Sequence, residues 1–260
     1  MKKNLQIPAA LALLCPLVAS GASFTSTGSG DWVAGGTWSG GPPNTGAVGS
    51  VGVDSVTIAG HDVTFNPATT PGGNSDWAVR GNQSVTIHSG GSLGQSAGGY
   101  WIRIGDNEAG TVTVNDGTFR VQNASALYSA TRGADATFNI GDGVGAAESA
   151  LLDTSGKTVN LSADIGGGGV GTTTINILSD GLFLGNGGIK RFAQHGVVNL
   201  NIDGGTYRAG SGNTEFGSQD VSSGTVTLTN GGSINQQSGD LHMGYNGDID
   251  VVLHQNSSIQ

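Results

Sequence analysis

The sequence predicts an all-β fold, a right-handed parallel β-helix (β-solenoid), and three observations lead to this prediction. Glycine accounts for 48 of the 260 residues, whereas its usual share is about 7%. Short runs such as SVTIHSGGSL alternate aliphatic residues with Ser, Thr or His, which is the pattern of a half-buried strand. A phrase of this kind also recurs at a nearly constant interval, and such a period is typical of solenoids.

The recurring phrase is clearest in GTVTVNDGTFRV (residues 110–121) and GTVTLTNGGSI (residues 224–234). Further copies are VTIHSGGSL, INILSDGLF, LNIDGGTY and VVLHQNSSI, which begin at Val85, Ile175, Leu200 and Val251. The turn residues of the successive copies are Gly60, Gly91, Gly117, Gly156, Gly181, Gly205, Gly232 and Ser257, at intervals of 31, 26, 39, 25, 24, 27 and 25. We therefore expect about eight coils of roughly 25 residues each.

Two irregularities and a second marker refine this prediction. The two long intervals contain NPATTPGGNS (residues 66–75) and GDGVGAAESA (residues 141–150), which we interpret as inserted loops. An apolar residue followed by Gly recurs at Ile104-Gly105, Ile165-Gly166, Phe216-Gly217 and Met243-Gly244. Each coil should thus hold two or three short strands, separated by turns whose Gly, Asn or Asp residues tolerate a positive φ.

The pairing of equivalent strands in successive coils distinguishes a solenoid from the alternative fold, a β-sandwich or jelly roll. In a solenoid each strand pairs with its equivalent one coil along, so similar residues stack. Nothing in a sandwich requires one phrase to recur at a constant interval. Right-handed coiling is expected because parallel crossover connections prefer that hand. We also expect Gly117, Gly205 and Gly232 to adopt backbone conformations that other residues avoid.

Composition excludes several classes of protein. A collagen helix requires Gly at every third position, and that period is absent. The chain carries 10 basic and 19 acidic residues, a formal charge of −9. An acidic chain without a basic run is a poor ligand for nucleic acid and is repelled by anionic membranes.

The segment 1–22 has the layout of a cleavable secretory signal peptide. Lys2 and Lys3 precede an apolar stretch, and small residues end the segment at Ala22. The apolar stretch is shorter than the roughly 20 residues of a membrane anchor, and Leu14 before Cys15 argues against a lipid anchor. We therefore expect a secreted or cell-surface protein that, after cleavage, has no cysteine and no disulfide.

Residues 23–55 do not show the repeat and are interpreted as an N-terminal cap. Trp32, Trp38 and the pair Pro42-Pro43 suit that role, because an open solenoid end exposes core and unpaired strand edges. The alternative is that the two tryptophans are exposed and stack on sugar rings. The predicted organisation is a signal peptide (1–22), a cap (23–55) and a repeat domain (56–260). Because the chain stops within a repeat at Ile259-Gln260, we expect the natural protein to continue.

The repeated pattern V-T-aliphatic, Asn/Asp-Gly-Gly, L/F-x-I/M-Gly resembles the autotransporter-associated β-strand repeats. Similar repeats occur in exported bacterial proteins with a PEP-CTERM sorting tail, and W-x5-W-x-GG-PP (Trp32 to Pro43) is similar to the start of such proteins. The resemblance covers roughly residues 30–260. It implies a passenger or surface protein with a β-helical body, and it implies no catalytic residues.

Two glycine-rich segments superficially resemble nucleotide-binding motifs. IGDGVGAAESALL (residues 140–152) contains G-x-G-x-x-A, but a dinucleotide fingerprint also needs a following helix. GGGGVGTTT (residues 166–174) lacks the Lys of a phosphate-binding loop. We interpret the first as an insertion and the second as a turn, and we expect no cofactor at either.

Calcium is the one cofactor worth testing. Turn carboxylates recur at Asp106, Asp116, Asp142, Asp180, Asp203 and Asp248. Calcium requires six to eight oxygen ligands, however, and the repeated GGxGxDx loop of calcium-binding β-rolls is absent. Asp is also a good turn former, so we expect no metal site. His61, His88, His242 and His254 show no short metal-ligand spacing.

A polysaccharide-cleaving β-helix, lyase or hydrolase, is the enzymatic alternative. Such enzymes need paired carboxylates or an acidic metal site with a nearby base, and the chain contains no Asp-Asp pair. Lys190, Arg191 and His195 lie together in GIKRFAQHGVV, which we interpret as an exposed basic loop. We therefore predict a surface, adhesive or matrix-type structural protein with no catalytic residues. Its partners would be extracellular glycans or other surface proteins. The second alternative is a non-catalytic glycan-binding module.

Overall fold

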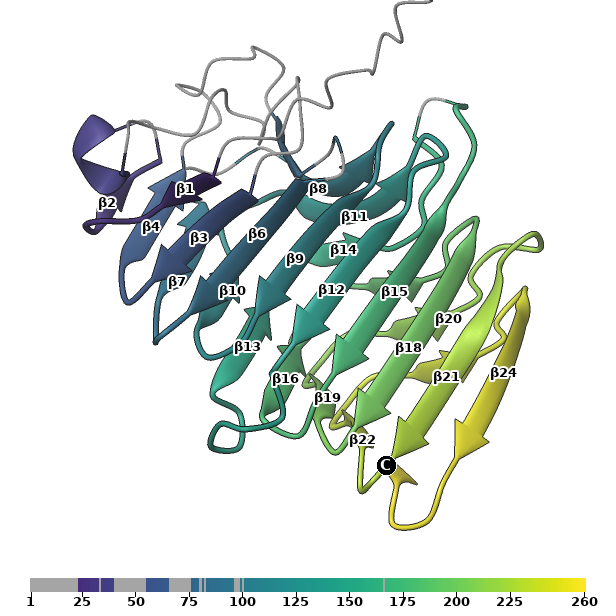
Figure 1. The fold of residues 1–260 in the computed structure, drawn as a ribbon. Helices are drawn as coiled ribbons and strands as arrows, with labels where there is room; N and C mark the ends of the chain where they lie inside the picture. The colour runs from purple at the N-terminus through teal and green to yellow at the C-terminus, as the bar shows by residue number, and fades with distance from the viewer. Residues whose placement is uncertain are drawn as a thin grey trace, which may run out of the picture.

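The architecture is seen in a computed structural model, which describes residues 23–32, 34–39, 55–65, 76–79, 81, 83–95, 99, 101–165 and 167–260. The predicted signal peptide, the pair Pro42-Pro43 and the insertion at 66–75 lie outside these residues. The described chain winds into a β-solenoid whose strands form three parallel sheets along its length (Figure 1). The predicted fold class is therefore confirmed.

Every named strand pairs in parallel with its equivalents in the neighbouring coils. The first sheet contains β1 (Ser23–Thr25), β3 (Ser55–Ala59), β6 (Gln83–His88), β9 (Gly110–Val114), β12 (Ala136–Ile140), β15 (Thr172–Ile177), β18 (Val197–Asp203), β21 (Ser223–Thr229) and β24 (Asp248–Leu253). The second sheet contains β2 (Gly30–Asp31), β4 (Asp62–Phe65), β7 (Ser92–Gln95), β10 (Thr118–Arg120), β13 (Ala150–Asp153), β16 (Gly181–Leu184), β19 (Thr206–Ala209), β22 (Ser233–Gln236) and β25 (Ser258–Ile259). The third sheet contains β5 (Asp76–Val79), β8 (Trp101–Asp106), β11 (Ala126–Thr131), β14 (Thr158–Asn160), β17 (Lys190–Phe192), β20 (Thr214–Phe216) and β23 (Leu241–Met243).

The coil length agrees with the period of the sequence. About seven turns of roughly 26 residues are present, and partial coils flank the seven that contribute to all three sheets. Successive register partners in the first sheet are Val56, Val85, Val112, Phe138, Ile175, Leu200, Val226 and Val251, which are 29, 27, 26, 37, 25, 26 and 25 residues apart. The chain passes down the front sheet and returns behind it while the coils advance from β3 to β24, which is a right-handed path (Figure 1).

The one long interval between described coils has two causes, whereas the sequence indicated one. The coil that begins with β12 has about six extra residues between β12 and β13, within 141–149, as predicted. About six more lie between β14 and β15, within 161–171, where no insertion was expected. Both additions lie at corners of the coil, so the register of all three sheets is preserved on either side.

The core consists of inward-facing side chains that stack along the solenoid. In β9, β12 and β15 the burial alternates residue by residue, because successive side chains of a strand point to opposite faces. Aromatic residues stack in the same way: Phe192 and Phe216 are register partners with ring centroids 4.5 Å apart and nearly parallel planes. Burial of these columns is the main source of stability available to a chain without disulfides.

The N-terminal end of this core is covered by tryptophans. Trp32 is fully buried and Trp38 is 3% exposed, and their rings meet edge-on at 4.9 Å. Trp38 Nε1 donates a 2.7 Å hydrogen bond to the carbonyl oxygen of Trp32. These residues follow β1 and β2, which pair with β3 and β4, so the predicted cap segment also begins the sheets. The burial supports a capping role and contradicts the alternative that both rings are exposed for stacking on sugars.

A column of left-handed residues marks one end of the third sheet. It consists of Gly105, Ala130, Ser162, Ala193, Gly217 and Gly244, at φ values of 70°, 51°, 52°, 58°, 67° and 67°. The apolar-Gly marker of the sequence therefore identified this corner correctly at Gly105, Gly217 and Gly244. It was wrong at Ile165-Gly166: the equivalent pair is Leu161-Ser162, and Gly166 lies outside the described residues. Three coils place Ala or Ser at this position, where glycine would be less strained.

The turn glycines recur in the repeat for a reason other than the one expected. Gly117, Gly205 and Gly232 do not have positive φ values. Each instead lies against the backbone of the preceding coil: a Cβ on Gly232 would stand 2.3 Å from the carbonyl oxygen of Ile202, and one on Gly205 would stand 2.2 Å from that of Leu178. The requirement for glycine is therefore the close approach of two coils.

Helical structure among the described residues is limited to the 3₁₀ turn η1 (Gly35–Thr37). Within those same residues, no helix is long and apolar enough to cross a membrane.

We expect Gly232→Val to lower the free energy of unfolding by about 3 kcal/mol, because the added atoms would overlap the backbone of the preceding coil. The matched control is Gly231→Ala. Gly231 has a φ of +86°, but a Cβ there meets nothing closer than 3.8 Å, so the cost should be only about 1 kcal/mol of backbone strain. Urea unfolding of both variants measures the difference, and equal losses would contradict the close-approach explanation.

Candidate functional site

The outer surface of the first sheet carries a regular array of uncharged polar side chains. Eight consecutive strands, β1 to β21, each contribute two outward residues separated by one inward residue, and the register aligns them in two columns. We call this array the hydroxyl–amide face. It consists of Ser23, Thr25, Ser55, Thr57, Ser84, Thr86, Thr111, Thr113, Thr137, Asn139, Thr174, Asn176, Asn199, Asn201, Thr225 and Thr227.

The spacing of the face is set by the backbone. Adjacent rows are one strand separation apart, about 4.8 Å, and the two residues of a row are about 6.7 Å apart along the strand. Every residue of the face is partly or fully exposed. The strands lie side by side and point the same way along the whole sheet (Figure 1), so the array is continuous.

Hydrogen bonds along one column fix its side chains in place. Asn201 Nδ2 donates to Asn176 Oδ1 at 3.0 Å, and Asn176 Nδ2 donates to Asn139 Oδ1 at 2.9 Å. Asn139 Nδ2 in turn donates to Thr113 Oγ1 at 3.3 Å. In the other column Thr225 Oγ1 donates to Asn199 Oδ1 at 3.1 Å. The amides are therefore ordered before any partner arrives, which reduces the entropy lost on binding.

The other two sheets provide an internal comparison. An equivalent outward column of the second sheet contains Arg120, Asp153, Leu184 and Arg208 in register. Outward positions of the third sheet include an aromatic residue and charged residues. Because all three sheets stack in the same way, the stacking of like residues alone does not explain why these two columns of the first sheet consist only of Ser, Thr and Asn over eight strands.

The segment GIKRFAQHGVV is not an exposed basic loop, and that prediction is wrong. Lys190 and Arg191 belong to strand β17, and Lys190 is 1% exposed. Its register partners are Val159 and Thr214, which places it in an inward column of the core. The alternation could have revealed this, since Lys190 precedes the buried Phe192 by two residues and therefore shares its face.

The ammonium group of Lys190 is satisfied by backbone oxygens. Nζ donates a 2.7 Å hydrogen bond to the carbonyl oxygen of Lys157 and a second one to that of Gly187. Burial lowers the pKa of Lys190 from 10.5 to about 8. Nearby in the core, Tyr207 Oη lies 2.9 Å from Thr214 Oγ1, and burial raises the pKa of Tyr207.

Arg191 and His195 do not join Lys190 in a common site. The Arg191 side chain points outward, where Nε donates to Glu215 Oε2 at 3.3 Å and Nη1 donates to Asn160 Oδ1 at 3.3 Å. His195 Nδ1 accepts a 3.3 Å hydrogen bond from the backbone N–H of Asp164. The three residues have separate structural contacts, and the proposed grouping came only from their closeness in sequence.

Four of the six turn carboxylates considered for calcium, those of Asp106, Asp116, Asp180 and Asp203, accept hydrogen bonds from neighbouring coils. Asp180 is 1% exposed, and its Oδ1 accepts from the backbone N–H of Gly143 at 2.8 Å. Asp203 Oδ1 accepts from Thr229 Oγ1 at 2.9 Å. Asp106 Oδ1 accepts from Thr131 Oγ1 at 2.8 Å. Within the described part of the chain, no three His, Cys, Asp or Glu residues form a group that could hold a metal ion.

The segment with the faint dinucleotide fingerprint has no helix. Residues 141–149 form a loop that leads from β12 directly into β13, so no helix N-terminus is available for a pyrophosphate. The described part of GGGGVGTTT is a corner loop followed by β15. Both interpretations made from the sequence therefore agree with the structure.

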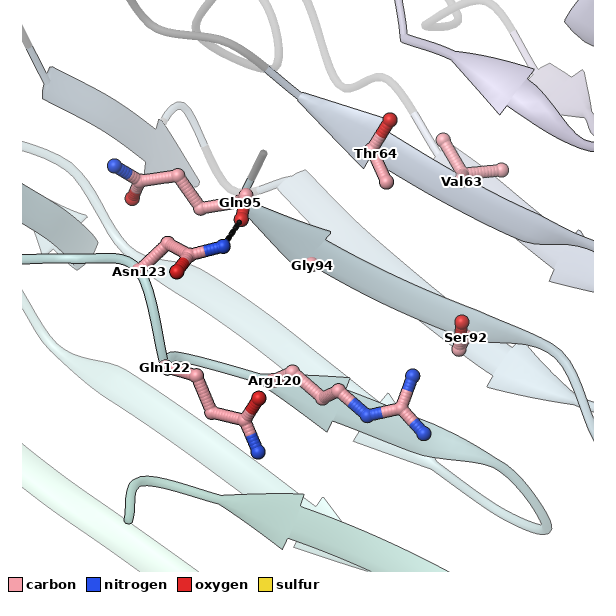
Figure 2. Close-up of a pocket in the computed structure, with 8 residues that line it drawn as sticks. All are labelled: Val63, Thr64, Ser92, Gly94, Gln95, Arg120, Gln122 and Asn123. Atoms are coloured by element: carbon pink, nitrogen blue, oxygen red, sulfur yellow. Dashed lines mark hydrogen bonds between the residues drawn. The ribbon is translucent and has the colours of Figure 1, made fainter. Parts of the chain in front are cut away.

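A small polar hollow lies on the outside of the second sheet. Figure 2 shows its lining, in which Asn123 Nδ2 donates a 2.6 Å hydrogen bond to the backbone oxygen of Gln95. Gly94 has no side chain there, and Arg120 is the one charged residue in the lining. The hollow measures about 210 Å³, less than the roughly 300–1,000 Å³ of a small-molecule site. It lacks the grouped acid, base and nucleophile that catalysis requires.

The third sheet has a more varied outer surface. The Trp101 and Tyr128 rings meet edge-on at 5.2 Å, and the Arg103 guanidinium lies over the Trp101 ring at 5.1 Å from its centroid. Arg103 Nη1 also lies 3.4 Å from Asp106 Oδ2. The Trp101–Tyr128 contact links adjacent coils, whereas both Arg103 contacts lie within β8 and give the arginine a structural role.

Comparisons with protein-family models, with curated proteins and with solved structures find no match to this chain. The functional argument therefore depends on the geometry described above.

The burial of Lys190 leads us to predict how the free energy of unfolding depends on pH. Lys190 releases its proton near pH 8 when folded and near pH 10.5 when unfolded, so the unfolded chain binds more protons between these values and stability rises with pH. From pH 8 to pH 10 we expect this residue to add about 2–3 kcal/mol to the free energy of unfolding. Above pH 10 the ionisation of Tyr207 in the unfolded chain opposes the effect.

The measurement is urea unfolding of the parent and of Lys190→Met between pH 7 and pH 10. Lys190→Met should lack this rise in stability, while Lys157→Met, which also removes one charge, should retain it. Identical pH profiles for the parent and Lys190→Met would contradict the assignment.

Proposed function

We propose that this protein is a secreted bacterial surface protein whose β-solenoid serves as an adhesive or matrix-type structural rod. The observation that carries the proposal is the hydroxyl–amide face, which repeats the same uncharged groups over eight strands. A binding site of this form is spread along the rod and is not concentrated in one pocket. Its affinity accumulates from many weak contacts along the rod, as in multivalent adhesion.

The export signal and the resemblance to autotransporter-associated repeats also support a location outside the cell. Lys2, Lys3, the apolar stretch and Ala22 form the expected signal peptide. The body that follows needs no cysteine to be stable, because its core columns and parallel sheets provide burial and hydrogen bonds.

Catalysis is a weaker explanation of the described residues. An enzyme concentrates a few groups with shifted proton affinities in one cleft. Here the most strongly shifted groups, Lys190 and Tyr207, are enclosed in the core, while the polar hollow at Gly94 contains neither. A polysaccharide lyase or hydrolase would need its acid and base on an accessible face.

Attachment should decline gradually as the face is altered. Cells that display the protein should attach to at least one surface in a panel of cellulose, chitin, silica and ice. Adding Thr86→Asp, then Asn139→Asp, then Thr225→Asp should reduce attachment by about two- to tenfold at each step, because each charge removes only part of a multivalent contact.

The matched control places the same number of charges on non-adjacent strands of the second sheet, as Thr118→Asp, Thr206→Asp and Ser258→Asp. These variants should attach like the parent. Parent cells that attach to no surface in the panel would contradict the adhesive function. Degradation of cellulose or chitin by the purified protein would favour the enzymatic alternative instead.

Export should remove the segment 1–22. When the full chain is produced in a bacterial host, the protein recovered outside the cytoplasm should begin at Ser23, and mass spectrometry of the intact chain measures this. Lys2→Glu combined with Lys3→Glu should reduce export, because the signal needs a positive start. Exported protein that retains Met1 would contradict cleavage.

A further inference from the structure

The hydroxyl–amide face contains no charged side chain among its sixteen residues. Ionisable residues of the first sheet lie beside it, at positions such as His88 and Asp203, or in the last strand β24. Binding partners are usually matched in electrostatic potential. An uncharged face therefore fits a neutral partner better than a mineral salt, an anionic lipid surface, a nucleic acid or an acidic peptide.

The face also contains no aromatic ring. The aromatic residues on the outside of the described solenoid include Trp101 and Tyr128, and both belong to the third sheet. Aromatic side chains provide large, flat apolar contact areas, which is how proteins commonly hold the apolar faces of sugar rings. A crystalline polysaccharide is thus a poorer match for this face than a lattice whose units are no larger than a hydroxyl group.

The geometry of the face is that of a rigid lattice. Rows repeat at about 4.8 Å and residues within a row at about 6.7 Å, and hydrogen bonds such as that from Asn176 to Asn139 lock the side chains. A partner that contacts many rows at once must itself be flat, rigid and periodic. A flexible polymer would lose conformational entropy with each row that it matched.

Water in ice has these properties. The oxygen rows on the surface of ice repeat at nearly the spacing of β-strands in a sheet. A threonine hydroxyl both donates and accepts hydrogen bonds, as a water molecule does, and an amide does so through two different atoms. The threonine methyl groups, as at Thr111 and Thr113, add apolar area that is removed from liquid water when the face meets the solid.

We propose that the hydroxyl–amide face binds the surface of ice, with its hydroxyl and amide groups taking the place of water molecules in the outermost layer. This inference rests on the proposed function, because it names the surface to which the adhesive rod attaches. It explains why the two columns of the hydroxyl–amide face are uniform, since only the face that meets the lattice must match it.

Thr111 lies in the middle of the face and provides the test. The purified protein, with and without Thr111→Tyr, is placed in a solution that is slowly frozen, and the fraction that enters the ice is measured together with the gap between melting and freezing temperatures. The parent should enter the ice and open such a gap. Thr111→Tyr should reduce both by at least fivefold, because the ring would hold the flat face away from the lattice.

Thr118→Tyr on the second sheet is the matched control and should behave like the parent. Thr111→Val keeps the shape of the side chain and should fold normally, which circular dichroism would verify. It should reduce the fraction of protein that enters the ice by about twofold. This second variant keeps the inference testable even if Thr111→Tyr does not fold. A parent that is excluded from ice like serum albumin would overturn the inference, as would equal losses in Thr111→Tyr and Thr118→Tyr.

Two further outcomes separate this inference from the proposed function. Binding of the parent to cellulose or chitin particles, with exclusion from ice, would overturn the ice inference and leave the adhesive function standing. A dimer in sedimentation that Thr111→Tyr dissociates would show that the face binds a second copy of the chain, and it would also overturn the inference. Failure on every surface of the attachment panel would overturn both.

Discussion

Parallel pairing between each strand and its equivalent one coil away is the constraint on which this structure depends. The pairing supplies nearly all backbone hydrogen bonds of the sheets and sets a single separation between coils. Side chains in register must then stack at that separation, both inside and outside. The core columns, the Asn ladder and the close approach at Gly232 are all consequences of the same spacing.

The constraint also determines where the chain can vary. Extra residues lie at the corners of a coil, within 141–149 and 161–171, because an insertion within a strand would reverse the facing of every later side chain. Several polar groups enter the core, and they are not all satisfied: the buried amide of Gln83 has no hydrogen-bond partner among the described residues. Lys190 is tolerated because two carbonyl oxygens accept its protons, and its lowered pKa shows the remaining cost of burial.

The spacing between coils constrains the residue types on the outer faces less than those in the core. The difference in composition between the outer faces of the first and second sheets therefore needs an explanation other than the fold. The second sheet presents Arg120, Asp153 and Leu184 in one column without loss of register. The uniformity of the hydroxyl–amide face is therefore not required by the fold. The proposed binding of an uncharged periodic surface would account for both the composition and the regularity.

The sequence by itself determined the fold class, the coil length and the buried face of the first-sheet strands that carry the recurring phrase, because an apolar–polar alternation that recurs at a nearly constant interval leaves few other structures. It also indicated the capping tryptophans. It was wrong for the coil of β12, where the expected turn residue Gly156 lies between β13 and β14 and not between the first and second sheets. Only the tertiary structure decided the rest. The register between coils decides whether Lys190 points inward, why Gly232 must be glycine, and which polar residues form one continuous face. Register relates residues that are one whole coil apart in the sequence, so no local pattern displays it.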